Sequence, residues 1–292
     1  MRMRVASIGN FDGGHLGHQA LILALCKKAQ ELDCEPVVFT FEPLTHEYFG
    51  RKSEGRLMRL SDKIQWLQSM GVAHIKCLSF KKNLANLSAD AFINDYLQKN
   101  HIIHLISGED FRFGLNRTGN ADLLRAHHIE VTQIAAIGGD ARVSSTTIRG
   151  LLREGKLKEA ALQLGRPYQF SGRVIHGDKR ARCLGFPTAN LSLARFQCPL
   201  RGVFQVKVGL YHGNSIARWY AGIANMGIRP TVKGLKSLCE VHIFDFSNSL
   251  YGQRIVVEPV LKIREEKRFE SLEQLRQQIV EDVELVKSVS KG

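Results

Sequence analysis

The sequence predicts two domains of different class: an α/β domain with a doubly wound parallel sheet, followed by an antiparallel β domain that ends in a helix. Three observations predict this division. The chain has 292 residues, more than a single core of about 150 residues comfortably supports. Its first half alternates short apolar runs with amphipathic helical stretches, whereas from about Tyr168 the apolar runs follow one another without helices between them. We therefore expect domains over residues 1–166 and 167–292.

The first half contains five expected strands: Val5–Ile8, Val37–Phe41, His74–Phe80, Ile102–Ile106 and Ile129–Ile134. It contains four expected helices: Gln19–Leu32, Asp62–Met70 after Ser61, Ala89–Lys99 after Ser88, and Ala121–His127. In such a sheet, ligands bind beyond the carboxyl ends of the strands. The loops after Ile8, Phe41 and Ile106 are therefore expected to surround one site.

The second half contains five expected strands: Phe170–Ile175, Val203–Leu210, Ile216–Ile223, Leu238–Phe246 and Arg254–Ile263. Their short spacing favours an antiparallel barrel or sandwich. A final helix is expected over Leu272–Val286. The segment Glu154–Arg166 is expected to hold the last short helices of the first half and the junction.

The composition is that of a globular protein outside the membrane, with 44% hydrophobic and 24% charged residues. The apolar run after Met1 is too short for a signal peptide, and no apolar span of about 20 residues follows, so we expect a cytoplasmic protein that makes no membrane contact. The six cysteines lack C-x-x-C or metal-like spacing, which favours buried reduced thiols over disulfides or zinc. They are Cys26, Cys34, Cys77, Cys183, Cys198 and Cys239.

The net charge is +13, and most of the excess lies in the second half. Such a charge indicates anionic ligands, which are nucleotide phosphates or nucleic acid. The charge alone does not choose between them. Against nucleic acid, the sequence contains no helix-turn-helix, zinc-finger or aromatic RNA-binding pattern, and the positive residues are dispersed.

A glycine-rich turn follows the first expected strand: Gly9-Asn-Phe-Asp-Gly-Gly-His-Leu-Gly-His18. The glycines allow a ligand to approach the backbone closely. His15 and His18 share one face of a helix start, where free N–H groups and the helix dipole favour phosphate. The alternative is a glycine turn with two surface histidines.

A second element, Val143-Ser-Ser-Thr-Thr-Ile-Arg149, opens another helix after the last strand of the first half. Its hydroxyls, exposed N–H groups and arginine suit a triphosphate tail. Plain capping of the helix by Ser144 or Ser145 is the alternative.

Together these elements resemble the nucleotidyltransferase superfamily, with its H-x-G-H turn and late S-S-T-x-I-R segment. The resemblance narrows to the adenylyltransferase half of bacterial bifunctional riboflavin kinase/FMN adenylyltransferase, also called FAD synthetase, through Gly9-Asn-Phe-Asp-Gly13, Phe41-Glu-Pro43 and Gly108-Glu-Asp-Phe-Arg-Phe-Gly114. That family continues F-E-P with His-Pro, where this chain has Leu44-Thr45, a departure that bears on the flavin contacts of this loop. The resemblance implies catalytic roles for His15, His18 and Arg149. It implies nucleotide contacts from Gly9, Phe11, Gly17, Ser144, Ser145 and Thr146, and flavin contacts from Asn10, Asp110 and Phe111.

The second half contains Gly177-Asp-Lys-Arg-Ala-Arg-Cys-Leu-Gly-Phe-Pro-Thr-Ala-Asn190. Thr188 and Asn190 point the same way in an extended segment, and oxygen side chains suit Mg²⁺. From the residues alone, a basic loop that enters a strand is the favoured interpretation. In Leu238–Phe246, alternation places Glu240 and His242 on the face opposite Cys239, and an ordinary solvent-facing carboxylate is the default interpretation of Glu240.

This second half resembles the riboflavin kinases, first through G-F-P-T-A-N. Further matches are Gly202-Val-Phe204, Asn225-Met-Gly-Ile-Arg-Pro-Thr231, Glu240-Val-His242, Leu250-Tyr-Gly252 and Leu261-Lys-Ile-Arg-Glu-Glu-Lys-Arg-Phe269. The resemblance implies a β-barrel with a terminal helix. It makes Thr188 and Asn190 the ATP–Mg²⁺ contacts, Arg182 a phosphate contact, Gly177 and Gly185 nucleotide-loop residues, Glu240 the general base and Arg264 a flavin contact. Ala181 replaces the family's usual glycine, which bears on how the loop closes.

The resemblance implies a bifunctional enzyme that phosphorylates riboflavin to FMN and adenylylates FMN to FAD, releasing pyrophosphate. Its substrates would be ATP, riboflavin and FMN, its cofactor Mg²⁺, and apo-flavoproteins would be candidate recipients of the products. Two alternatives stay open at this point. One is a riboflavin kinase whose N-terminal half has lost adenylyl transfer, and the other is a basic nucleic-acid-binding protein.

Overall fold

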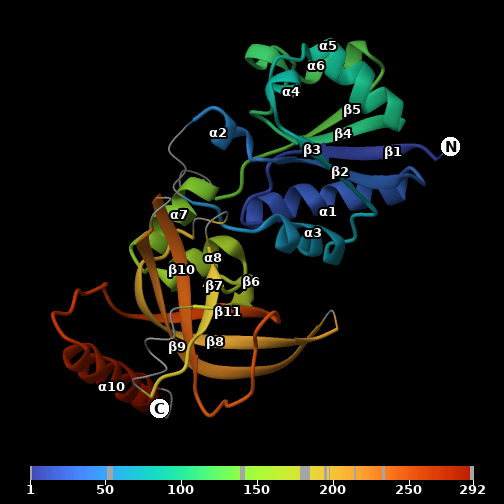
Figure 1. Cartoon of the computed structure of the whole chain (residues 1–292). Helices are drawn as coiled ribbons and strands as arrows, with labels where there is room; N and C mark the ends of the chain where they lie inside the picture. The colour runs from blue at the N-terminus through green and yellow to red at the C-terminus, as the bar shows by residue number, and fades with distance from the viewer. Residues whose placement is uncertain are drawn as a thin grey trace. The chain divides into compact units, whose positions relative to one another are not determined.

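The computed structural model describes residues 2–50, 55–138, 142–177, 185–193, 196, 198–213, 215–231 and 234–289. The chain forms two compact units (Figure 1). The first comprises Met1–Ser53 and Leu60–Ser145, and the second comprises Glu54–Arg59 and Thr146–Gly292. The functional boundary between residues 166 and 167 stays a prediction, because a division by contacts does not say which helices an isolated fragment needs.

The first unit contains a five-stranded parallel sheet with the order β3-β2-β1-β4-β5. Its strands are β1 (Arg4–Ile8), β2 (Glu35–Glu42), β3 (His74–Ser79), β4 (Ile102–Gly108) and β5 (Glu130–Ile134). Since the order changes direction at β1, helices cover both faces. The expected doubly wound α/β class is confirmed.

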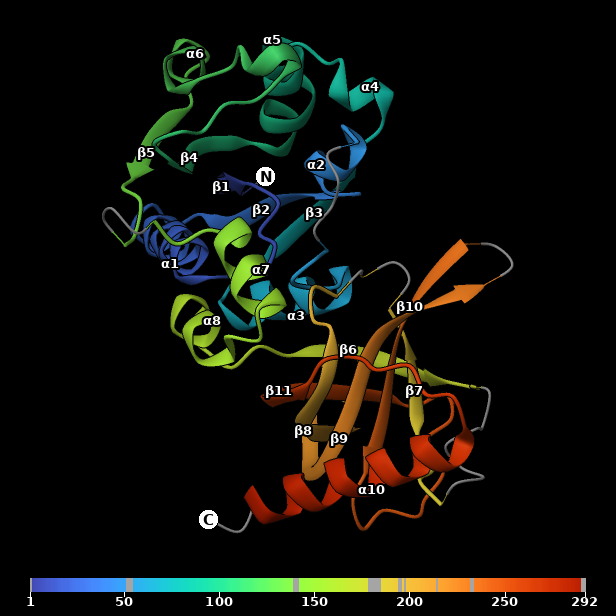
Figure 2. The ribbon, with the colours of Figure 1, turned by 90° about the vertical axis from the view of Figure 1, so that its left-hand side faces the viewer.

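Two apolar clusters lie on opposite faces of this sheet, and Figure 2 shows helices on both sides of it. On one face, α1 (Leu16–Glu31) and α3 (Leu60–Ser69) bury Ile22, Leu25 and Leu67. On the other face, α5 (Ala89–Phe92) and α6 (Ala121–Ala126) pack against β1, β2 and β4. The shorter elements are α2 (Thr45–Tyr48), α4 (Lys82–Ala85), a π-helical turn Ile93–Leu97, and 3₁₀ turns Gln98–Asn100 and Leu115–Arg117.

The second unit contains a closed six-stranded barrel with the order β10-β7-β6-β11-β8-β9. Its strands are β6 (Phe170–Ile175), β7 (Ala189–Ser192), β8 (Gly202–His212), β9 (Ser215–Thr231), β10 (Gly234–Ile243) and β11 (Arg254–Arg264). All six neighbouring pairs are antiparallel. The barrel is thus confirmed over the sandwich, and β7 is the strand that sequence periodicity missed.

Among the described residues, three helices accompany the barrel: α7 (Ser145–Arg153), α8 (Leu157–Leu164) and α10 (Leu272–Val289). Helix α10 packs on the barrel wall (Figure 2), where Val283 and Val286 contact Val203, Ile223 and Phe244. Phe186, Ile263 and Ile279 are partly buried against the same cluster. The terminal helix is therefore a packed part of the barrel unit.

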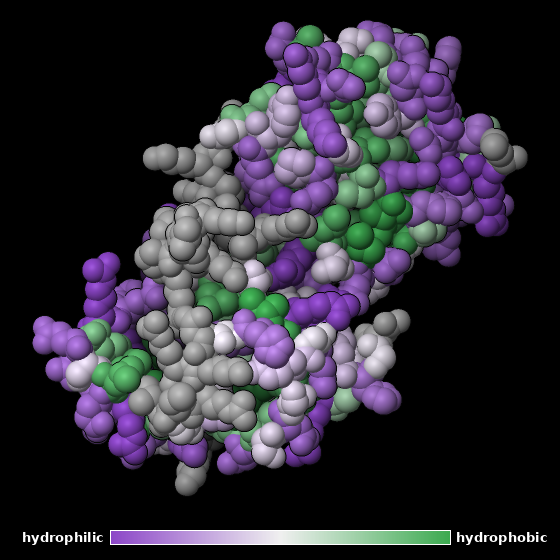
Figure 3. Space-filling model, viewed as in Figure 1, coloured by the Kyte–Doolittle hydropathy of each residue, from purple (hydrophilic) through white to green (hydrophobic). Residues whose placement is uncertain are grey.

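On the face drawn in Figure 3, hydrophilic side chains predominate and hydrophobic ones form small groups between them. Among the described residues, no helix is long and apolar enough to cross a membrane.

We expect Gly14→Ala to lower the free energy of unfolding of the first unit by about 2–4 kcal/mol. Gly14 has φ +53°, and an added Cβ would lie 2.7 Å from the ring of Trp66, so backbone strain adds to overpacking. Gly50→Ala is the matched control, since its φ is +66° and nothing lies within 4 Å; it should cost about 1 kcal/mol. Urea unfolding followed by Trp66 fluorescence in a Trp219→Phe background measures both. Equal costs for the two variants would contradict the close Gly14–Trp66 approach.

Candidate active sites

The first site is built on the turn between β1 and α1. The Gly9 N–H donates to the Phe39 carbonyl at 3.0 Å, which attaches the start of the turn to β2. Phe11 is buried at φ +48°. The turn is thus fixed at the carboxyl edge of the sheet, where the sequence predicted a ligand site.

The two histidines of this turn are held against each other at the start of α1. His15 is the N-cap, and its Nδ1 accepts a hydrogen bond from the His18 N–H at 3.4 Å. Their rings stack with centroids 3.7 Å apart, and Phe11 meets His18 edge-on at 5.2 Å. His15 is only 7% exposed, so the surface-histidine interpretation does not hold for it. Gly17 lies against the His15 ring.

The late serine segment meets the same turn. The Ser145 hydroxyl donates to the Asp12 carbonyl at 2.8 Å, across 133 positions of sequence. Ser144 is half-buried and Thr146 is exposed. The structure therefore brings together two elements that the sequence predicted as one site.

Arg149 lies further along α7, in the part assigned to the second unit. It is buried, and its Nε donates to the Gly55 carbonyl at 2.6 Å. This arginine therefore has a structural role at the segment Glu54–Arg59, and its contact with phosphate stays a prediction.

Asn10 holds the loop that follows β2. Its Nδ2 donates to the Thr45 hydroxyl at 2.9 Å, and its Oδ1 accepts from the Thr45 N–H at 3.2 Å. Leu44 is buried beside it. The departure Leu44-Thr45 thus fits the loop through a two-point contact with Asn10.

The other two expected flavin contacts lie after β4. Phe111 is half-buried and stacks on Phe113 with centroids 5.5 Å apart. Asp110 is exposed and forms an ion pair with Arg142. Neither position is tested as a flavin contact by this geometry.

Lys63 is a buried cation that the sequence interpretation missed. It is 1% exposed, and its Nζ donates to the Thr40 hydroxyl at 3.1 Å. Thr40 in turn donates to the Asn10 carbonyl at 3.3 Å. The signal was present, because Lys63 lies one helical turn before the buried Leu67 and therefore on the apolar face of α3.

The second site is a row of polar side chains across three strands of the barrel. Glu240 on β10 pairs in register with Asn190 on β7 and with Asn225 on β9. Directly opposed residues in antiparallel strands face the same side. The adjacent Cys239 and Val241 are fully buried, so the row faces away from the barrel interior.

Asn190 is held in place by its neighbours. Its Nδ2 donates to the Thr188 carbonyl at 3.3 Å, and a Cβ on Gly177 would lie 2.5 Å from its carboxamide. Only glycine fits at 177 with this side chain in place. Asn190 is 5% exposed, and its Oδ1 is buried with no hydrogen-bond partner in the described part of the chain.

Thr188, directly before β7, is half-buried, and Gly185, three residues earlier, is exposed. The loop residues 178–184, which include Arg182 and Ala181, lie outside the described residues. His242 continues the face of Glu240, where its Nδ1 contacts the Pro187 carbonyl at 2.9 Å and its ring meets Phe186 at 5.5 Å. This pairing joins the G-F-P-T-A-N segment to β10.

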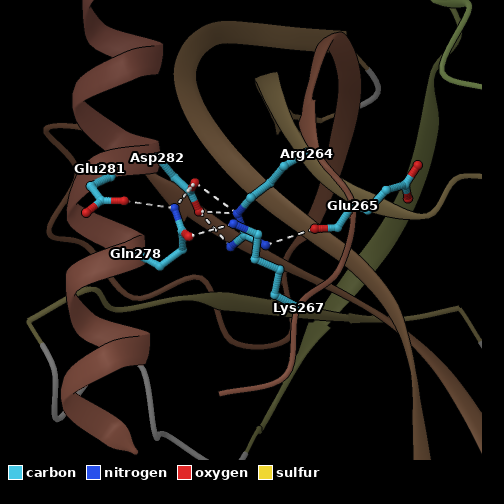
Figure 4. A network of polar contacts seen from close by, with 6 residues as sticks. All are labelled: Arg264, Glu265, Lys267, Gln278, Glu281 and Asp282. Atoms are coloured by element: carbon cyan, nitrogen blue, oxygen red, sulfur yellow. Dashed lines mark hydrogen bonds and ion pairs between the residues drawn. The ribbon is translucent and has the colours of Figure 1, made fainter. Parts of the chain in front are cut away.

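Arg264 is engaged with the terminal helix (Figure 4). Its Nε lies 3.0 Å from both carboxylate oxygens of Asp282, and its Nη2 lies 2.7 Å from one of them. Gln278 donates to the same carboxylate at 3.2 Å. The expected flavin contact of Arg264 stays a prediction, and its observed role is to attach α10 to the end of β11.

The two described thiols of the barrel interior, Cys198 and Cys239, are unsuited to nucleophilic chemistry. Burial raises the pKa of the Cys198 thiol to about 11. Burial likewise raises the pKa of Cys239 well above its usual value. Within the described residues, no three His, Cys, Asp or Glu side chains are grouped to hold a metal ion.

Comparison with known proteins agrees with this two-site arrangement. A family model described as FAD synthetase matches residues 1–147, and one described as riboflavin kinase matches residues 164–290. The bifunctional riboflavin kinase/FMN adenylyltransferase of Haemophilus influenzae is 43% identical over 97% of this chain and 92% of its own length. The chain belongs to the bifunctional riboflavin kinase/FMN adenylyltransferase family. The resemblance found in the sequence motifs is confirmed.

Other relatives extend the comparison. The Escherichia coli K12 member of the family is 41% identical, covering 95% of this chain and 90% of its own. A solved structure named as a macrolide-efflux protein from Streptococcus pneumoniae has a TM-score of 0.81 and 30% identity, covering 98% of this chain and 94% of that chain. That name belongs to the pneumococcal protein, and the similarity is one of fold.

We expect Asp282→Ala to lower the free energy of unfolding of the second unit by about 2–4 kcal/mol, because it leaves the nearly buried guanidinium of Arg264 without its anion. The side chains of Arg264 and Asp282 are 16% and 6% exposed. The neighbouring Glu281→Ala is the control, and as an exposed site it should change stability by less than about 0.5 kcal/mol. Urea unfolding followed by Trp219 fluorescence in a Trp66→Phe background measures both. If the two variants are equally stable, the ion pair does not hold α10.

Proposed function

We propose that this chain carries out both reactions of its family at two separate sites. The barrel unit transfers the γ-phosphate of ATP to riboflavin, and the parallel-sheet unit transfers the adenylyl group of ATP to FMN. The observation that carries the proposal is that each unit has its own phosphate-suited constellation on its own core. His15, His18 and Ser145 belong to one, and the row through Glu240 belongs to the other.

In the kinase reaction, the attacking group is the terminal hydroxyl of riboflavin, which is neutral and must lose a proton. We assign Glu240 as the general base, since a positioned carboxylate accepts the hydroxyl proton as the bond to the γ-phosphorus forms. Its register between Asn190 and Asn225 places it beside oxygen-bearing side chains. Gly177, Arg182 and Gly185 are assigned to the nucleotide loop, and Arg264 to the flavin side.

Mg²⁺ is the cation we assign to this site. The Thr188 hydroxyl and the buried Asn190 Oδ1 would hold it, and their hard oxygen chemistry fits a magnesium ion that keeps phosphates and waters as its other ligands. When bound, the ion neutralises charge on the phosphates of ATP.

In the adenylyl transfer, the attacking group is the phosphate of FMN, which is already an anion. No strong base is needed, so alignment and charge neutralisation supply the catalysis. Because His15 Nδ1 accepts a hydrogen bond, Nε2 is the ring nitrogen that can donate a hydrogen bond to a phosphate oxygen. His18 is assigned the same role.

The remaining assignments follow the resemblance to the family. Gly9, Phe11 and Gly17 shape the backbone against the nucleotide, and Ser144, Ser145 and Thr146 hold the departing pyrophosphate at the start of α7 with Arg149. Asn10, Asp110 and Phe111 line the flavin side. Lys63 stabilises the turn through Thr40, whose hydroxyl accepts from Lys63 and donates to the Asn10 carbonyl.

We further propose that the protein works in the cytoplasm, where ATP is abundant and thiols such as the buried Cys198 and Cys239 stay reduced. Apo-flavoproteins are proposed as recipients of the FMN and FAD it makes. Nucleic acid is not proposed as a partner.

We expect Glu240→Gln to reduce riboflavin phosphorylation by roughly 10²–10⁴-fold, because the variant keeps the shape of the side chain and removes the base. The same variant, given FMN directly, should make FAD at the rate of the unaltered chain. Riboflavin, FMN and FAD separated over time, with ATP and Mg²⁺ present, measure both steps.

We expect the double variant His15→Ala with His18→Ala to convert riboflavin to FMN and to stop there. The imidazoles act on the anionic phosphates of the second step only. Loss of both activities in a correctly folded form of either variant would mean one shared site. Accumulation of FMN without FAD by the unaltered chain, under varied flavin and metal conditions, would remove the adenylyltransferase assignment.

A further inference from the structure

Asn225 on β9 has a side-chain oxygen for which no hydrogen-bond donor is found among the described residues. This oxygen, Oδ1, is shielded from solvent. Buried polar groups are paired in more than about 90% of cases in folded proteins, and each exception calls for an explanation. A ligand that supplies the missing donor is such an explanation.

The strand-register neighbours of Asn225 show on which side of the kinase site it lies. It is the register partner of Glu240 on one side and of Val203 on the other. Asn190 lies across Glu240 from it, with a second unpartnered buried oxygen. The Glu240 carboxylate therefore lies between two carboxamide side chains. Asn190 is on the side of the nucleotide loop, and Asn225 is on the opposite side, called the far side below.

The residues next to Asn225 on the far side are apolar, and the row ends at Arg264, the register partner of Val203. Val203 belongs to the cluster that α10 covers, and so does Ile223, two residues before Asn225 and on the same face of β9. An isolated acceptor beside apolar surface suits a hydroxyl group on a chain attached to a flat ring system.

We propose that Asn225 is a substrate-binding residue that accepts a hydrogen bond from a secondary hydroxyl of the ribityl chain of riboflavin. This inference rests on the kinase activity proposed above. With that hydroxyl held on the far side, the terminal hydroxyl lies over Glu240, on the path toward the γ-phosphate at the Asn190 side. Asn225 thereby makes the site selective for a polyol chain.

The test compares riboflavin with a synthetic flavin whose side chain keeps only the terminal hydroxyl. Their dissociation constants are measured through quenching of flavin fluorescence, so the readout does not depend on phosphate transfer. A site that hydrogen-bonds a substrate hydroxyl rejects an analogue that lacks it, and we expect the unaltered chain to bind riboflavin at least about tenfold more tightly. Turnover of riboflavin, measured separately, reports on the proposed kinase activity itself.

In Asn225→Ala, we expect the preference for riboflavin to shrink by about tenfold or more, through weaker binding of riboflavin and unchanged binding of the analogue. Asn225→Ser keeps an acceptor and should retain part of the preference. The exposed Asn248→Ala, in the same unit, is the control and should change neither constant. Because the Asn225 oxygen has no partner among the described residues, Asn225→Ala should also unfold at no lower urea concentration than Asn248→Ala.

Three results would overturn the proposal. One is an Asn225→Ala variant that binds both flavins equally more weakly. Another is an unchanged preference together with a raised Mg²⁺ requirement for turnover, which would make Asn225 a metal ligand. The third is a loss of stability with the preference intact, which would make it a structural residue.

Discussion

The register of β10 between β7 and β9 is the constraint on which the barrel site depends. Side chains alternate along a strand, so a slip of one residue would move every side chain to the opposite face. In the observed register, Cys239 and Val241 fill the interior and Glu240 faces outward with Asn190 and Asn225. The apolar residues thus fix the position of the polar ones. Burial of Cys239 and the outward position of the half-buried Glu240 are two consequences of one pairing.

The parallel-sheet site depends on a different constraint, which is the close packing of the backbone of the turn after β1 against neighbouring side chains. The turn after β1 packs so tightly that Gly14 lies against the ring of Trp66, and His15 caps α1 from a buried position. Ser145 then attaches a distant helix start to the same turn. One site orders phosphates around an anion that is ready to attack, and the other must take a proton from a neutral hydroxyl. The two chemistries therefore need different groups, and the chain supplies them in separate cores.

Sequence periodicity and motifs predicted both fold classes, because alternating apolar patterns depend on local geometry. They missed β7, since four residues after a proline-containing loop carry too short a pattern. They also missed the partners of polar groups. The contacts of Arg264 with Asp282 and of Lys63 with Thr40 join residues that only tertiary packing brings together. A charged residue on the apolar face of its helix, Lys63 in α3 and Asp282 in α10, was the sequence signal for each contact. Asn225 gave no such sign, because its importance comes from the register opposite Glu240.

The central claim is that the two sites are complete and independent, with FMN passing between them through solution. Mixing the Glu240→Gln variant with the His15→Ala and His18→Ala double variant tests it directly, because neither protein alone should convert riboflavin to FAD. With riboflavin, ATP and Mg²⁺, we expect the mixture to form FAD after a lag that shortens as the concentration of the kinase-competent variant rises. FMN accumulation without FAD in the mixture, while the Glu240→Gln variant converts added FMN, would show that FMN does not leave the chain that made it. Such a result would contradict the account.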